Sequence, residues 1–131
     1  MKDLVGTWRL VRTTAWAEDG SERPAPYGGG TGMGVVVLNA DGRMIAVLCD
    51  GRPGPDDGKP REYNSYCGNY TFDGKQLVTR VDASSKPERM GSDQVRDVRF
   101  EGDLMVLRPP AIIVNGEQVQ RELYWKKVAE A

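Results

Sequence analysis

Turn-forming residues at short, regular intervals constrain this chain more than any other feature. Asp41-Gly42, Asp73-Gly74, Glu101-Gly102-Asp103 and Asn115-Gly116 each lie between segments rich in valine, leucine, methionine and aromatic residues. Such residues supply the positive φ angles that tight β-hairpins need. No stretch of useful length shows the sustained apolar repeat of about 3.6 residues that indicates an amphipathic helix. The chain is therefore expected to be all-β.

The segments that flank these turns predict eight strands, over residues 6–14, 34–38, 43–49, 66–72, 76–83, 94–100, 104–108 and 117–128. Strands joined by short hairpins form an antiparallel meander, and eight of them close most readily into an up-and-down β-barrel. Closure also removes exposed edges, along which the apolar segment 35–38 would otherwise pair with other chains. A length of 131 residues suits one domain, so residues 1–131 are expected to form a single barrel.

Two long connections, residues 15–33 and 50–65, interrupt the regular spacing. Loops of this length are uncommon in compact domains unless they have a function, such as covering a binding site. In a simple meander both would join an odd-numbered strand to the next even-numbered one, so both would lie at the same end of the barrel. They are either lids over a binding site or flexible surface insertions.

The alternation of side chains along each strand predicts which residues face the barrel interior. With Asp73-Gly74 as a two-residue turn, Phe72 pairs with Lys75 and Tyr70 with Leu77, and paired residues share a face. The same reasoning at Glu101-Gly102 pairs Val98 with Met105 and Arg96 with Leu107. The predicted interior residues are Tyr66, Tyr70, Phe72, Leu77, Thr79, Val81, Gln94, Arg96, Val98, Phe100, Met105, Leu107, Val119, Arg121, Leu123 and Trp125. A slip of one residue would reverse each assignment.

Arg96 and Arg121 are unusual members of this interior set, because a buried guanidinium group is costly unless it is paired. They either extend into water at the barrel mouths, or pair with Glu117 or another carboxylate, or hold an anionic group of a bound molecule. The planar guanidinium matches carboxylate, phenolate and enolate groups. Tyr66 and Tyr70 would add hydroxyl contacts, although tyrosine inside a barrel more often only packs.

Composition excludes several classes of function. The chain has no histidine, which excludes Ser-His-Asp and Cys-His catalysis and the usual histidine-rich metal sites. Its 18 basic and 19 acidic residues give a net charge of −1, which argues against a nucleic-acid-binding protein. No segment approaches 18 consecutive apolar residues, so no membrane contact is expected.

The remaining motifs indicate no cofactor or metal. Residues 28–34 are glycine-rich but lack the spacing of a dinucleotide-binding turn, and Pro60 stands where a phosphate loop needs serine or threonine. The adjacent carboxylates at 56–57 are expected to be solvated rather than to bind a cation. Without an apolar leader at the N-terminus, we expect a cytoplasmic protein in which Cys49 and Cys67 are free thiols, with a disulfide as the minor alternative.

Several motifs resemble one protein family. Gly6-Thr7-Trp8 resembles the Gly-x-Trp first strand of lipocalins, and Tyr66-Cys67-Gly68-Asn69-Tyr70 with Asp73-Gly74 resembles the small bacterial and fungal lipocalin-like domain family. Further similar motifs, in the same order along nearly the whole chain, lie at 82–84, 94–96, 102–103, 109–110 and 123–125.

The resemblance implies an eight-stranded barrel with a central cavity for a small, mostly apolar molecule. It also implies that Lys127 packs against Trp8. Members often have histidines in the fifth strand, where this chain has Thr79 and Arg80, so no role of those histidines is transferred.

The leading hypothesis is a cofactor-free barrel that binds a small, largely apolar organic molecule, with its polar or anionic group near Gln94, Arg96 and Arg121. The other expected ligand contacts are Tyr70, Phe72, Thr79, Val98, Met105, Leu123 and Trp125. The first alternative is a cofactor-free cyclase, isomerase or dehydratase of natural-product biosynthesis. There Arg96 and Arg121 would stabilise an oxyanion, and Tyr70 or Tyr66 would transfer a proton.

A second alternative is a structural or partner-binding barrel whose interior is filled by its own side chains. The expected partner is a small-molecule ligand or substrate, with neither nucleic acid nor membrane. The chain is either a monomer or a homodimer.

Overall fold

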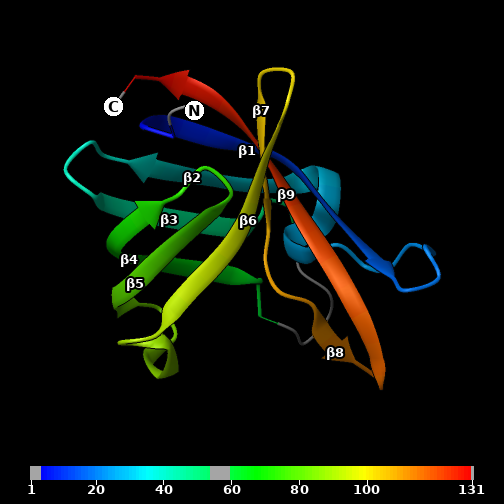
Figure 1. Cartoon of the computed structure of the whole chain (residues 1–131). Helices are drawn as coiled ribbons and strands as arrows, with labels where there is room; N and C mark the ends of the chain where they lie inside the picture. Colours follow the sequence, from blue (N-terminus) through cyan, green and yellow to red (C-terminus); the bar gives the residue numbers. More distant parts are fainter. Residues whose placement is uncertain (1–3, 54–59, 131) are drawn as a thin grey trace.

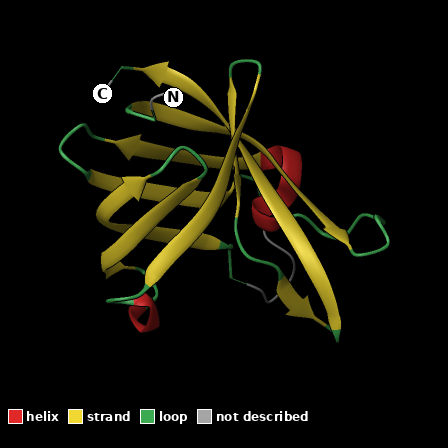
Figure 2. Cartoon of the chain, in the orientation of Figure 1, coloured by secondary structure: helices red, strands yellow, loops and turns green. Residues whose placement is uncertain are grey.

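The structure is a computed structural model that describes residues 4–53 and 60–130 (Figure 1). Its elements in chain order are β1 (Gly6–Ala17), η1 (Pro26–Thr31), β2 (Gly32–Leu38), β3 (Arg43–Asp50), β4 (Tyr63–Phe72), β5 (Gln76–Ser84), η2 (Pro87–Arg89), β6 (Asp93–Glu101), β7 (Leu104–Arg108), β8 (Ile112–Val114) and β9 (Glu117–Ala129). Figure 2 distinguishes the strands from η1 and η2, which are short 3-10 helices. The prediction of an all-β fold is confirmed. None of the helices among the described residues has the length and apolar character to cross a membrane.

The strands form a closed antiparallel barrel. Neighbouring strands follow the order β1-β2-β3-β4-β5-β6-β7-β9, and pairing of β1 with β9 closes the circle. These eight strands are the predicted ones, with some ends extended. Among the described strands the additional strand β8 pairs with β9 alone, and all three of its residues are exposed. Sequence reasoning missed β8 because three exposed residues are too few to show an alternating pattern.

Two predicted hairpin registers are wrong by two residues. Phe72 pairs with Leu77 and Phe100 with Met105, whereas the sequence-based registers paired Phe72 with Lys75 and Val98 with Met105. At the first hairpin the Asp73 carboxylate accepts hydrogen bonds from the amides of Lys75 and Gln76, at 2.8 and 2.7 Å, which favours a four-residue connection. A shift of two residues preserves the face of every side chain, so the interior assignments survive the error.

One end of the barrel is closed by tight hairpins and by residues near the N-terminus. Leu38 and Met105 are completely buried in the core there and Leu4 almost so. The indole of Trp8 donates a hydrogen bond to the Leu4 carbonyl at 2.9 Å. The Lys127 ammonium lies 5.3 Å from the centre of the Trp8 ring, so the packing that the resemblance implied is confirmed.

The opposite end carries the longer connections, each running from an odd strand to an even one or through β8. The β1–β2 connection contains η1, and it contacts the β3–β4 connection through a hydrogen bond from the Gly51 amide to the Thr31 carbonyl at 3.0 Å. The expectation that the two long connections share one end is therefore confirmed. The carboxylates at 56–57 lie outside the described residues.

Candidate functional site

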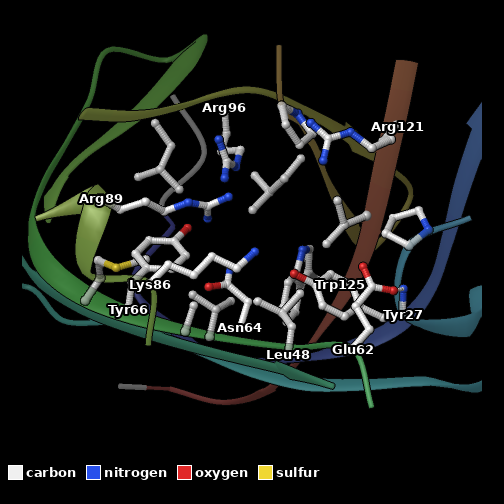
Figure 3. A pocket seen from close by; sticks show the side chains of 18 residues that line it. Tyr27, Leu48, Glu62, Asn64, Tyr66, Lys86, Arg89, Arg96, Arg121 and Trp125 are labelled. Atoms are coloured by element: carbon white, nitrogen blue, oxygen red, sulfur yellow. Dashed lines mark hydrogen bonds between the residues drawn. The ribbon is translucent and has the colours of Figure 1, made fainter. Parts of the chain in front are cut away.

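A cavity of about 110 Å³ lies inside the barrel and reaches the end that carries the long connections (Figure 3). Its apolar wall comes from strand residues of the interior face: Val36, Met44, Ala46, Leu48, Leu77, Leu107, Leu123 and Trp125. Its polar lining comes from strands and connections together: Tyr27, Glu62, Asn64, Tyr66, Lys86, Arg89, Arg96 and Arg121. The cavity therefore combines an oily wall with a cluster of charged and hydrogen-bonding groups.

Strand alternation explains how most of the polar groups reach the cavity. Asn64 and Tyr66 stand two residues apart on β4 and are both buried, with Glu62 two residues earlier at the strand entrance. Arg121 precedes Leu123 and Trp125 at the same spacing on β9. Side chains at even spacing on a strand point to one side of the sheet.

Two further cations come from the β5–β6 connection. Lys86 is the residue before η2 and Arg89 is its last residue, and both line the cavity. Figure 3 shows the Arg96 side chain between those of Arg89 and Arg121, with Arg89 extending into the cavity toward Arg96.

The charge of the lining is strongly unbalanced. Four cationic side chains, Lys86, Arg89, Arg96 and Arg121, face one carboxylate, Glu62. Over residues 4–53 and 60–130 none of the four cations forms an ion pair with a carboxylate. A small anion is the natural complement of such a surface.

Among the described residues, the hydrogen bonds of Arg96 and Arg121 go to uncharged acceptors. Arg96 donates to the Val95 carbonyl at 2.9 Å and to the Gln94 side-chain oxygen at 3.1 Å, so Gln94 orients it. Arg121 donates to the Pro110 carbonyl at 3.1 Å. The alternative that Glu117 neutralises them is wrong, because Glu117 pairs with Arg23 of the β1–β2 connection.

The poor solvation and the positive charge of the cavity shift the pKa values of two titratable groups that line it. Burial lowers the pKa of Arg121, and the nearby positive charge of Arg96 lowers it further. Burial also raises the pKa of Tyr27, against a smaller lowering by the Asn64 amide. Both directions reflect the cost of ionisation in a poorly solvated space, and repulsion between the two guanidinium groups would be relieved by a bound anion.

Three buried polar atoms at the cavity have no hydrogen-bond partner in the structure: Asn64 Oδ1, Arg121 Nε and Trp125 Nε1. Asn64 is only 4% exposed and Trp125 only 2%. Each unsatisfied buried group costs about 1–3 kcal/mol. All three belong to residues that line the same cavity, so a molecule bound there is in a position to complete their hydrogen bonds.

Tyr27 reaches the cavity from a strained backbone. It has φ 56° and ψ 28°, a left-handed conformation that is uncommon for a bulky residue, and two glycines with positive φ follow it. The Tyr27 amide donates to the Glu62 carboxylate at 2.6 Å, which joins η1 to the start of β4. Strain of this kind persists where surrounding contacts hold it, and it is often found at ligand sites.

Residues 5–128 match a protein family described as lipocalin-like domain. This chain belongs to the lipocalin-like domain family. The match confirms the resemblance found in the sequence and covers nearly all of the barrel. Comparison with curated proteins gives no match. A lipocalin-like barrel with an internal cavity is a fold suited to binding small molecules in general.

The lipocalin-like barrel brings together some of the sequence-predicted site residues. Arg96, Arg121, Tyr66, Leu123 and Trp125 all line the cavity. Gln94 lies beside it and bonds to Arg96. The key expectation that both guanidinium groups lie inside the barrel therefore agrees with the structure.

Other predicted site residues do not line the cavity. The Tyr70 hydroxyl donates to the Asn39 carbonyl at 2.7 Å, near the hairpin end of the barrel. Thr79 and Met105 are buried in the core, and Phe72 and Val98 pack partly buried against it. Alternation assigns a residue to the interior face but does not show which of the interior side chains border the cavity.

Sequence reasoning missed Tyr27, Glu62, Asn64, Lys86 and Arg89. Asn64 and Glu62 continue the alternation from Tyr66, but residues up to 65 were assigned to a loop, and β4 begins at Tyr63. The other three lie on connections, where no periodic pattern indicates direction. Only the tertiary structure shows that these connections fold over the cavity.

Neither a metal site nor a reactive thiol accompanies the cavity in the part of the chain that the structure describes. No group of three potential ligand residues is close enough to hold a metal ion among those residues. Cys49 and Cys67 are both free thiols, as expected. Burial raises the pKa of the Cys67 thiol, and so does its contact with Asp82, which makes Cys67 a poor nucleophile.

Proposed function

We propose that this lipocalin-like barrel binds a small, largely apolar organic anion, whose charged group is held by Arg96 and Arg121. The observation that carries the proposal is the presence of four cations and one carboxylate beside an apolar wall. A guanidinium group binds the two oxygens of a carboxylate through two parallel hydrogen bonds, which gives both affinity and orientation. Arg121 Nε, buried and without a partner, supports this assignment.

The size and lining of the cavity limit the ligand to one small ring. An apolar cavity of about 150 Å³ accepts benzene, and the present one is smaller, about 110 Å³, so the polar groups of a ring compound would extend beyond the enclosed space. Leu107, Leu123 and Trp125 would contact the hydrocarbon part. Tyr70, Phe72, Thr79, Val98 and Met105 do not line the cavity, so a ligand would contact them only by reaching beyond it.

Benzoate and its uncharged analogue benzamide provide a direct test. Isothermal titration should show benzoate binding at least about tenfold more tightly than benzamide, because only the acid complements the cations. Arg96→Met should weaken benzoate binding at least about tenfold, since it keeps the apolar stem and removes the charge. Arg80→Met is the matched control, because Arg80 is exposed and paired with Asp93.

The proposal would be contradicted if benzoate and benzamide bound with equal affinity. It would also be contradicted if Arg96→Met left the affinity for benzoate unchanged. Native mass spectrometry of freshly purified protein adds an independent readout. A small anionic molecule that co-purifies with the wild type and is absent from Arg96→Met supports the same site.

An enzyme that uses this cavity is the second candidate, and the position of Tyr66 favours it. Tyr66 is buried and lines the same cavity as Arg96 and Arg121. We propose that in a cyclase, isomerase or dehydratase the arginines would stabilise an oxyanion while Tyr66 transfers a proton. Tyr66→Phe should then abolish turnover of the substrate, while the affinity of the protein for that substrate stays nearly unchanged. If the protein only binds the molecule, neither the wild type nor Tyr66→Phe shows turnover.

A further inference from the structure

The cavity has a second polar side, opposite the arginines. Figure 3 shows Arg96 and Arg121 on one side of the space, and Asn64 and Trp125 on the other. Asn64 comes from β4 and Trp125 from β9, both from the interior face. The two sides are therefore built by different parts of the barrel and would contact different parts of one ligand.

The unsatisfied atoms on this second side are one acceptor and one donor. Asn64 Oδ1 accepts hydrogen bonds, and Trp125 Nε1 only donates them. Both side chains are more than nine-tenths buried, so bulk water does not complete their hydrogen bonds. Buried polar groups in folded proteins are almost always paired, and an exception needs a specific reason.

A hydroxyl group suits this pair of atoms. Its hydrogen can be donated to Asn64 Oδ1, and its oxygen can accept from Trp125 Nε1. A carboxylate cannot donate to Asn64, and an ammonium cannot accept from Trp125. A purely apolar group would leave both atoms unsatisfied, which a site formed by buried polar groups strongly disfavours.

From these groups we propose that the natural ligand is a hydroxy acid, with its carboxylate against Arg96 and Arg121 and its hydroxyl group against Asn64 and Trp125. The inference rests on the proposed function, because it uses the same cavity and the same anion position. It adds the second functional group and its place on the ligand. The apolar wall between the two sides favours an aromatic spacer.

The test compares benzoate with 3-hydroxybenzoate and 4-hydroxybenzoate by isothermal titration against the wild-type protein. At least one hydroxybenzoate should bind about 10- to 100-fold more tightly than benzoate, because its hydroxyl satisfies buried groups that benzoate leaves unpaired. Asn64→Leu, of similar size, should remove most of that gain, so that this variant binds hydroxybenzoate and benzoate with nearly equal affinity. Trp125→Phe should reduce the gain as well.

Each result has one meaning. Hydroxybenzoates that bind no more tightly than benzoate overturn the hydroxy-acid inference, while the dependence of benzoate on Arg96 still supports anion binding. A hydroxyl gain that persists in a folded Asn64→Leu protein also overturns it. Failure of all three acids to bind overturns the proposed function and the inference together. If Asn64→Leu does not fold, the comparison of ligands on the wild type and the Trp125→Phe variant decides.

Discussion

Replacing Arg121 with methionine should stabilise the ligand-free protein or leave its stability unchanged. Arg121 is half-buried, and within residues 4–53 and 60–130 its Nε has no partner and its guanidinium donates to the Pro110 carbonyl. Methionine keeps most of the apolar stem and adapts to irregular space. The variant therefore removes an unfavourable charge without opening a large cavity.

The magnitude follows from the groups that change. Removing a buried, unsatisfied donor gains about 1–3 kcal/mol, and losing a hydrogen bond from a charged group costs about 1.5–3 kcal/mol when that bond is well buried. Because Pro110 is exposed, the cost lies at the low end of that range. Arg96 also repels Arg121, and methionine ends that repulsion. The free energy of unfolding should rise by about 0–1 kcal/mol, with a Tm up to about 3–5 °C higher.

Arg99→Met is the matched control, because this arginine lies on the outer face of the barrel and pairs with Glu122. The Glu122 side chain is only 4% exposed, and Arg99, Arg108 and the Tyr124 hydroxyl all donate to it. Loss of Arg99 leaves the buried Glu122 carboxylate with fewer hydrogen bonds and less positive charge beside it. The free energy of unfolding of this variant should therefore fall by about 1–3 kcal/mol. The same substitution thus has opposite effects at the two positions.

Urea denaturation of wild type and both variants, with and without benzoate, measures these differences. The Arg121→Met protein should also lose the stabilisation that benzoate gives to the wild type, since ligand binding stabilises only a protein that retains its site. A loss of more than about 1 kcal/mol in ligand-free Arg121→Met would refute the reasoning. Such a loss would mean that Arg121 stabilises the fold, whereas the proposal assigns it to anion binding.

Three other predictions test the fold. Gly68→Ala should cost more than about 3 kcal/mol in thermal unfolding, because a Cβ there would lie 1.9 Å from a carbonyl oxygen of β5, whereas Gly30→Ala, with open space, should change stability by less than about 0.5 kcal/mol. Burial raises the pKa of Glu122, but its hydrogen bonds lower it more, to a net value below the ordinary 4.5. Stability from Glu122 should therefore be present above about pH 4.5 and fall as the pH drops below it, and Glu122→Gln should show a shallower acid loss in urea titrations. Lys127→Met should lose about 0.5–1 kcal/mol in the same assay through its contact with Trp8, and an unchanged midpoint would contradict that role.

The sequence by itself determined the barrel and the interior face of its strands. Four turn motifs and the apolar segments that flank them were sufficient to predict eight strands, and the alternation placed Arg96 and Arg121 inside. These inferences tolerate error, because a hairpin shifted by two residues, as at Asp73-Gly74, leaves every side chain on its original face. Local chemistry and a period of two are sufficient for such assignments.

Only the tertiary structure decided where along the barrel axis the cavity lies. Tyr70 and Arg96 share the interior face, yet the Tyr70 hydroxyl bonds to Asn39 near the hairpins while Arg96 lines the cavity. Lys86 and Arg89 reach the cavity from a connection whose direction depends on long-range contacts. The position of a side chain along the axis of a closed barrel depends on the stagger of all the strands together. No local pattern in the sequence contains that information.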